Sequence, residues 1–268
     1  MYHDQGVHTV LVCATGGEEG DLQNPSLREE GQPFHGLTPE QERAKLAELR
    51  PLELAESARI IGYDEVVMLG YRDSGMPDSE ANKKPEAFAN APFDEAVGRL
   101  VEIIRRERPQ VIITYNDDQA GYPHPDHLMV HDISVPAFHR AGDASWAPEL
   151  GDAWQPSKLY YTVWSMARIK KMHAKMLELG LESPFTPEWF ERPSQDDRIT
   201  TQIDVADYYH VRQEALLAHA TQVDPTSKFW FGLPDEVAKS LHPYDDYVLA
   251  HSHVGSDVPE SDVFAGIR

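Results

Sequence analysis

Three short apolar runs, each followed by a polar loop and then by a helical pattern, constrain the fold of this chain more than any other feature. They lie at Val7–Thr15, Glu65–Leu69 and Val111–Tyr115. Each run is rich in β-branched residues, which is typical of strands buried on both faces of a parallel sheet. Because such strands alternate with amphipathic helical patterns, the sequence predicts an α/β fold.

The first helical pattern has a clear start and an internal interruption. Thr38–Gln41 forms a capping box with proline at the first helical position, and the pattern continues toward Gly62. Pro51 interrupts it, so we expect a break or kink there, with Arg50 pushed toward extended geometry.

The later patterns complete a Rossmann-like arrangement. Apolar residues recur at helical spacing from Phe93 to Ile104, and a further helical pattern follows His124. Right-handed crossovers would place helices on both faces of a mainly parallel sheet. In the less regular second half we expect strands at 159–163 and 199–205 and helices at 166–179 and 208–220. We therefore expect a single domain over 1–268, with an α/β core over about 1–165 and a smaller C-terminal lobe over about 166–268.

Polar loops follow all three predicted parallel strands. They cover Gly16–Asp21, Gly70–Met76 and Asn116–His127. In open α/β sheets, ligands bind beyond the carboxyl ends of the strands. The sequence therefore predicts that the functional site lies where these three loops meet.

The third loop carries the densest group of chemically active residues. His124, Asp126 and His127 lie within four residues, at the point where the loop enters a helix. Imidazole nitrogen suits zinc, and a neighbouring carboxylate can fix the tautomer of a ligand histidine. Residue chemistry alone leaves two interpretations open, a metal or catalytic site and a set of ordinary helix residues.

Composition excludes several partners. The formal net charge is −21, which argues against nucleic acid and anionic membranes, because both require a basic face. No apolar run reaches the roughly 18–20 residues that span a bilayer, and no secretory signal is visible. Cys13 is the only cysteine, so no intramolecular disulfide can form. We expect a cytoplasmic protein without nucleic-acid or membrane partners; the composition leaves its oligomeric state open.

Four stretches in this order resemble the LmbE-like, or PIG-L, family of zinc deacetylases: Thr15–Glu18, Tyr71–Met76, Gly121–His127 and His219–Gln222. Within the family, the chain is most similar to the branch that acts on mycothiol S-conjugates. The resemblance implies a zinc-dependent hydrolase that cleaves the amide of an N-acyl glucosamine-inositol conjugate, with a small thiol-sugar conjugate as substrate. The alternative within the family is an N-acetylglucosaminyl-inositol deacetylase.

The resemblance also implies roles for the residues of the third loop. His127 would be a ligand of one Zn²⁺ ion. His124 would stabilise the oxyanion and protonate the leaving amine, with Asp126 assisting proton transfer. Tyr122 would lie over the scissile carbonyl. These roles match what amide hydrolysis requires, which is an activated water, donors for the oxyanion and an acid for the leaving nitrogen.

Three further residues are implied on the substrate side. Arg50 and Asp73 would bind hydroxyl groups of the sugar or inositol, and His219 would contact the substrate. Without the resemblance, Arg50 and Asp73 would be interpreted as ordinary exposed charges. His219 would be interpreted as a core histidine, because it follows Leu216 and Leu217 on an apolar helix.

One family motif is absent. The family's His-Pro-Asp-Asp-Glu motif follows its first strand and supplies two zinc ligands and the general base. His242–Asp246 has similar residues, but its spacing differs by one and it lies in a predicted loop. We therefore expect that the first strand is missing and that the printed sequence is an amino-terminally shortened form. The alternative is a non-catalytic, sugar-binding remnant.

Overall fold

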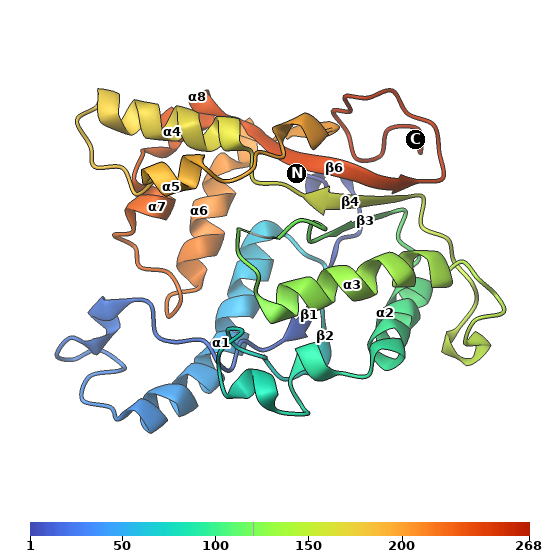
Figure 1. Cartoon of the computed structure of the whole chain (residues 1–268), viewed down its shortest axis with the longest axis horizontal. Helices are drawn as coiled ribbons and strands as arrows, with labels where there is room; N and C mark the ends of the chain where they lie inside the picture. Colours follow the sequence, from blue (N-terminus) through green and yellow to red (C-terminus); the bar gives the residue numbers. More distant parts are fainter. Residues whose placement is uncertain (120) are drawn as a thin grey trace.

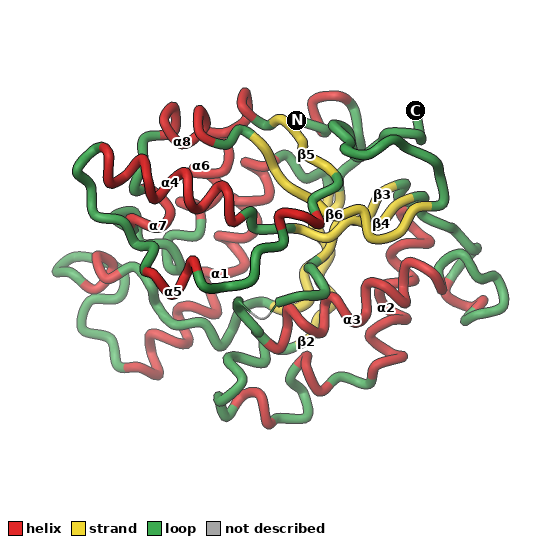
Figure 2. Tube along the Cα trace, turned by 45° about the horizontal axis from the view of Figure 1, so that its top comes forward, coloured by secondary structure: helices red, strands yellow, loops and turns green. Residues whose placement is uncertain are grey.

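The computed structural model describes residues 1–119 and 121–268, and its strands form two separate sheets. In the first sheet, β1 (Val10–Thr15) pairs in parallel with β2 (Glu65–Tyr71). The second sheet has the order β3-β4-β6-β5 (Figure 2). Its strands are β3 (Val111–Thr114), β4 (Lys158–Thr162), β5 (Thr201–Asp204) and β6 (Tyr244–Ser252).

Strand direction changes along the second sheet. β3 and β4 are parallel, whereas β6 is antiparallel to both of its neighbours. The α/β class is therefore confirmed, but the interpretation of His242–Asp246 as a loop is wrong, because β6 begins at Tyr244. Two consecutive aspartates obscure the start of this strand in the sequence. One of them, Asp246, is buried and paired with His242 at 2.7 Å.

The helices lie in two groups (Figure 1). α2 and α3 pack side by side, and α1 packs against α6. In chain order the helices are α1 (Pro39–Ile61), α2 (Phe93–Glu107), α3 (Pro125–Arg140), α4 (Met166–Glu178), α5 (Pro187–Phe190), α6 (Tyr209–Ala218), α7 (Lys228–Phe231) and α8 (Asp235–Leu241). Within the described ranges, no helix has both the length and the apolar character needed to cross a membrane.

The start of α1 follows the sequence prediction, but its middle does not. The Gln41 amide donates to Thr38 Oγ1 and the Thr38 amide donates to Gln41 Oε1, which completes the capping box. The expected break at Pro51 and the extended geometry expected at Arg50 are wrong, because α1 continues through both residues. A kink at Pro51 stays a prediction. An internal proline costs a helix about 3 kcal/mol. The packing of α1 against α6 offsets that cost.

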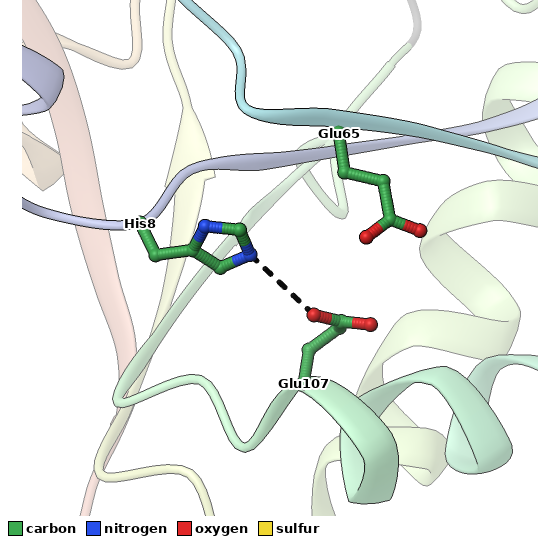
Figure 3. A group of neighbouring side chains, drawn as sticks. All are labelled: His8, Glu65 and Glu107. Carbon is green, nitrogen blue, oxygen red and sulfur yellow. Dashed lines mark ion pairs between the residues drawn. The ribbon is translucent and has the colours of Figure 1, made fainter.

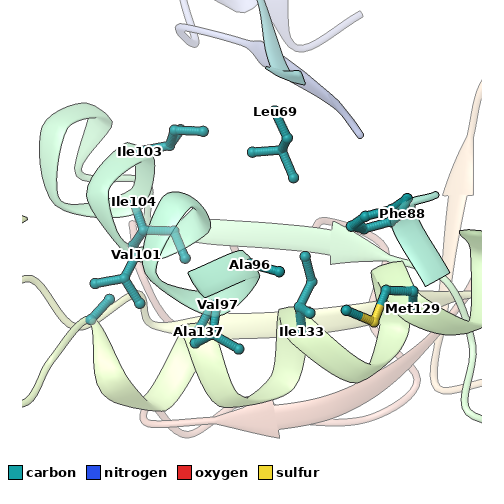
Figure 4. Packing of buried hydrophobic residues seen from close by; sticks show 11 residues of the cluster. Leu69, Phe88, Ala96, Val97, Val101, Ile103, Ile104, Met129, Ile133 and Ala137 are labelled. Atoms are coloured by element: carbon teal, nitrogen blue, oxygen red, sulfur yellow. The ribbon is translucent and has the colours of Figure 1, made fainter. Parts of the chain in front are cut away.

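One apolar cluster joins the two sheets. α2 and α3 contribute most of its buried residues, among them Val97, Val101 and Ile133 (Figure 4). Leu69 of β2 and Ile112 of β3 both pack against this helix layer, so the two sheets share one core although they exchange no hydrogen bonds. On the opposite face, Met68 of β2 and Ile113 of β3 are each 44% exposed.

Candidate functional site

His124 is the N-cap of α3, and its capping hydrogen bond determines which ring nitrogen can carry a proton. The Asp126 amide donates to His124 Nδ1 at 3.2 Å. A ring nitrogen that accepts carries no proton, so the proton of the neutral ring lies on Nε2. Pro125 occupies the first helical position, where its missing N–H costs nothing. His124 therefore presents an Nε2–H donor from a fixed helix end.

His127 lies one helical turn further, beside His124. The two ring centroids are 5.0 Å apart, and His127 stacks on Tyr115 at 4.2 Å. Burial, reinforced by the neighbouring His124, lowers the pKa of His127 to about 4. The imidazole is therefore neutral near pH 7, so it has a free lone pair, as a metal ligand requires.

Asp126 is buried and only half satisfied. Its Oδ2 accepts from the Ser74 amide at 3.2 Å. Its Oδ1 has no hydrogen-bond partner among residues 1–119 and 121–268. Burial, together with the nearby Asp73 carboxylate, raises the pKa of Asp126. A buried acceptor without a partner costs about 1–3 kcal/mol, which is tolerated mainly where function requires it.

Asp73 joins the loops that follow β1 and β2. Its two carboxylate oxygens accept from the Gly75 amide at 2.8 Å and from the Glu19 amide at 3.3 Å. The Asp73 amide in turn donates to Glu18 Oε2 at 3.1 Å. These bonds hold the carboxylate beside Asp126 and bring the two loops to one place.

Arg50 reaches the same loops from α1. A Cβ built on Gly17, which has a φ of 73°, would lie 2.4 Å from Arg50 Nη2, so a larger residue there would displace the guanidinium. Burial lowers the pKa of Arg50, and the Glu53 and Asp73 carboxylates oppose this shift. An arginine remains charged after such a shift, so a cation lies near Asp73.

His219 lies at the end of α6, on the far side of Arg50. Burial and the Arg50 charge lower its pKa. Beside it, Glu53 accepts from the Thr221 amide and from Thr221 Oγ1, both at 2.7 Å. Sequence reasoning missed Glu53 and Thr221. Their available signals were the position of Glu53 three residues after Arg50 on one helix and the position of Thr221 within the fourth family stretch.

Tyr122 is the most exposed of the predicted residues. Its ring centroid lies 5.5 Å from that of His127 and 6.0 Å from that of His124. Its hydroxyl is 3.9 Å from the Met76 sulfur, in the loop after β2. Pairwise contacts and charge interactions thus link all seven predicted residues at one edge of the sheets: Tyr122, His124, Asp126, His127, Asp73, Arg50 and His219.

A second group of histidine and carboxylate lies at the other edge. His8, Glu65 and Glu107 place three potential metal donors within 4.8 Å of one another, the one such group in the described ranges (Figure 3). Arg106 pairs with both Glu65 and Glu107, so each carboxylate already has an ion-pair partner. Around His127, the described residues do not bring three donors together.

Sequence comparisons match this chain to one family and to curated relatives over almost its whole length. Residues 1–138 match the family model PIG-L, described as GlcNAc-PI de-N-acetylase. A mycothiol S-conjugate amidase of Streptomyces coelicolor is 41% identical, over 100% of this chain and 90% of its own length. A 1D-myo-inositol 2-acetamido-2-deoxy-alpha-D-glucopyranoside deacetylase of Thermobifida fusca is 36% identical, over 98% of this chain and 91% of its own.

The fold is similar to that of a solved relative. The N,N'-diacetylchitobiose deacetylase of Pyrococcus horikoshii superposes with a TM-score of 0.58, at 16% identity, over 91% of this chain and 73% of its own. On the family match and the whole-length identity to curated relatives, this chain belongs to the PIG-L family.

Proposed function

We propose that the protein is a hydrolase that cleaves the amide of an N-acyl glucosamine-inositol conjugate, as the mycothiol S-conjugate amidase that it resembles does by name. The observation that carries this proposal is the pairing of a proton-bearing His124 Nε2 with a neutral His127, 5.0 Å apart at one helix end. Amide hydrolysis needs a donor for the oxyanion and a group that holds or activates the attacking water.

His124 is the proton donor in this proposal. Its Nε2–H would stabilise charge on the carbonyl oxygen and then protonate the leaving nitrogen. Asp126, whose raised pKa lets it keep or exchange a proton more readily than an ordinary carboxyl group, would assist that transfer. Tyr122, exposed above both histidines, would cover the carbonyl.

Arg50, Asp73 and His219 would bind the sugar and inositol hydroxyls. Arg50 offers donors, the Asp73 carboxylate accepts, and a neutral imidazole at His219 does both. The Asp73 oxygens are already held by two backbone amides, so the carboxylate would be oriented before the substrate arrives.

We propose zinc as the cofactor, with His127 as one ligand. The neutral ring of His127 and the unpartnered Asp126 Oδ1 beside it fit a nearby cation. Bound zinc would supply a water acidic enough to be deprotonated near pH 7. Catalytic zinc normally has three protein ligands, so the other ligands would have to come from outside the described residues.

The sheets give an independent reason to expect another segment. Among the described residues, β1 pairs only with β2, and β3 pairs only with β4. One edge of β1 and one edge of β3 are therefore unpaired. Buried backbone groups are rarely left unpaired. One parallel strand between these edges would give the order of a doubly wound, Rossmann-like sheet. We propose that this strand carries the remaining ligands.

Two alternatives remain as outcomes of the test. The deacetylase alternative is supported by relatives such as that of Thermobifida fusca, at 36% identity. The non-catalytic remnant is supported by the lack of three gathered donors at His127 in the described residues. An assay on a chain that also includes residues encoded in frame upstream of Met1 separates all three, by comparing turnover of the N-acetylated sugar-inositol with turnover of the S-conjugated N-acetylcysteinyl sugar-inositol. Preferred turnover of the S-conjugate supports our proposal, preferred turnover of the acetylated sugar favours the deacetylase, and binding without turnover favours the remnant.

The cellular setting and domain division are proposals of the same kind. One cysteine and a net charge of −21 suit a reducing cytoplasm and a small-molecule substrate. We also propose that the whole chain is one domain, with the α/β core to about residue 165 and the remainder as a lobe that closes one side of the site through His219.

A further inference from the structure

Three histidines gather at the end of α3 that is opposite to the candidate active site. His139 lies in the last turn of α3, His251 lies in β6, and His253 follows that strand. His124 caps the other end of α3, about 22 Å away along the helix at 1.5 Å per residue. The cluster is therefore separate from the site described above.

The three rings share one apolar support. His251 and His253 both stack on the buried Phe138, with centroids at 5.9 and 5.5 Å. His251 at the end of β6 and His253 just beyond it therefore reach the same ring. His139 stands nearly perpendicular to both, with centroids 4.8 Å from His251 and 6.5 Å from His253.

No described residue satisfies these imidazoles. Their ring nitrogens have no hydrogen bond or ion pair within residues 1–119 and 121–268, although the chain carries 45 acidic residues. Burial and the two neighbouring histidines lower the pKa of His139, and no carboxylate opposes that shift. The cluster therefore offers three imidazoles whose ring nitrogens have no partner among the described residues.

The spacing is close to that of a metal site. Two imidazoles that bind one tetrahedral ion at about 2.0–2.1 Å have ring centroids about 5 Å apart. The His139–His251 pair is already at 4.8 Å. The three donor atoms do not yet converge within 4.8 Å. His139 and His253 are exposed, so their side chains can rotate to close the set.

We propose that His139, His251 and His253 form a second metal site, for a divalent ion that prefers imidazole nitrogen, such as Zn²⁺, Ni²⁺ or Cu²⁺. The three proposed ligands include no carboxylate, so the site would not suit Ca²⁺ or Mg²⁺, which prefer oxygen ligands. A bound ion would clamp the end of β6 to the last turn of α3. This site does not depend on the proposed hydrolytic function, because none of its residues contacts the catalytic loops.

The test is a Zn²⁺ titration of the untagged chain by calorimetry. The double variant His139→Ala/His253→Ala should lose one binding event, or weaken it at least tenfold. The matched control His35→Ala/His210→Ala removes two exposed imidazoles elsewhere and should bind as wild type does. With Cu²⁺, the electron paramagnetic resonance spectrum of wild type should show coupling to several imidazole nitrogens, and the double variant should lose it.

The results discriminate clearly. Equal Zn²⁺ binding by wild type and the double variant would overturn the proposal, as would an equal loss in the control. Because both substituted side chains are exposed, the variant should fold normally, and its melting temperature without metal should match that of wild type. The single variant His253→Gln, which keeps a side chain of similar size, should weaken the same event and repeats the test with minimal change.

Discussion

The amino-terminal and carboxyl-terminal ends of the strands β1 and β2 carry similar residues in different environments. At the amino-terminal ends of the strands, His8 and Glu65 are exposed and Glu107 is partly buried; Arg106 pairs with both glutamates, and His8 lies 3.5 Å from Glu107. At the carboxyl-terminal edge, His127 is half-buried with a pKa near 4, and a carboxylate oxygen of Asp126 is buried without a partner.

The difference shows that residue type alone does not identify a site. Both glutamates of the amino-terminal group already have an ion-pair partner in Arg106, so they do not require a ligand. In the carboxyl-terminal group, burial costs free energy and Asp126 Oδ1 has no hydrogen-bond partner among the described residues. Such groups persist mainly where they act on a ligand. Substitutions at the two edges should therefore have unequal effects.

The largest expected contrast is in catalysis. His124→Ala removes the Nε2–H donor and should lower kcat about 10²–10³-fold, as the loss of an oxyanion donor does. His8→Ala, at the other edge, should leave kcat within about twofold, since no role at the reacting bond is expected there. Steady-state amidase assays on both variants, made in the chain extended upstream of Met1, measure the contrast, and equal effects would remove the distinction between the two groups.

The next contrast is in stability. Glu53→Ala leaves the buried Thr221 amide and hydroxyl without their acceptor, so the free energy of unfolding should fall by about 2–3 kcal/mol. Glu65→Ala removes only a solvent-exposed ion pair and should cost about 0.5 kcal/mol or less. Urea denaturation of both variants tests this. A cost at Glu65 as large as that at Glu53 would contradict the account.

A third contrast concerns pH. Burial lowers the pKa of His127 to about 4, from about 6.5 for an ordinary histidine, so the unfolded chain binds more protons between these values. Stability should therefore fall as pH falls through this window, by about 2–3 kcal/mol in all. The raised pKa of Asp126 acts in the opposite direction. In His127→Asn the slope should flatten, and an unchanged slope would show that another group causes it.

The smallest contrast isolates the contact between Gly17 and Arg50. Gly17→Ala and Gly31→Ala both place a Cβ at positive φ, but only the first would collide with a side chain, Arg50. Both should lose about 1 kcal/mol from the backbone, and Gly17→Ala should lose about 1 kcal/mol more. It should also raise KM by displacing the guanidinium, whereas Gly31→Ala should not. Identical KM values would argue against Arg50 as a substrate contact.

The site was more predictable from the sequence than the sheet was. The Gly121–His127 stretch and the loops after parallel strands were enough to bring His124, Asp126 and Asp73 together, because strand ends in a parallel sheet converge. The unpartnered Asp126 Oδ1 and the Glu53–Thr221 bonds could not be predicted, since both depend on tertiary distances.

The errors have local physical causes. Pro51 was expected to break α1, but packing against α6 outweighs the loss of one backbone donor. The start of β6 was interpreted as a loop because Asp245 and Asp246 resemble turn residues. Arg212, the partner of Asp245, is distant in the sequence. His242, the partner of Asp246, is only four residues away, but its pairing cannot be recognised from the sequence. In both places tertiary partners override local preference.

The central claim is that His124 to His127 is one part of a zinc amidase centre that a further strand completes. The most direct test compares residues 1–268 with a longer chain that includes residues encoded in frame upstream, for zinc content and for release of free amine from an S-conjugated N-acyl glucosamine-inositol. We expect turnover only in the longer chain. We also expect that chain to bind a zinc ion that is lost in His127→Ala. A stop codon directly before Met1, or turnover by residues 1–268 that survives His124→Ala, would contradict it.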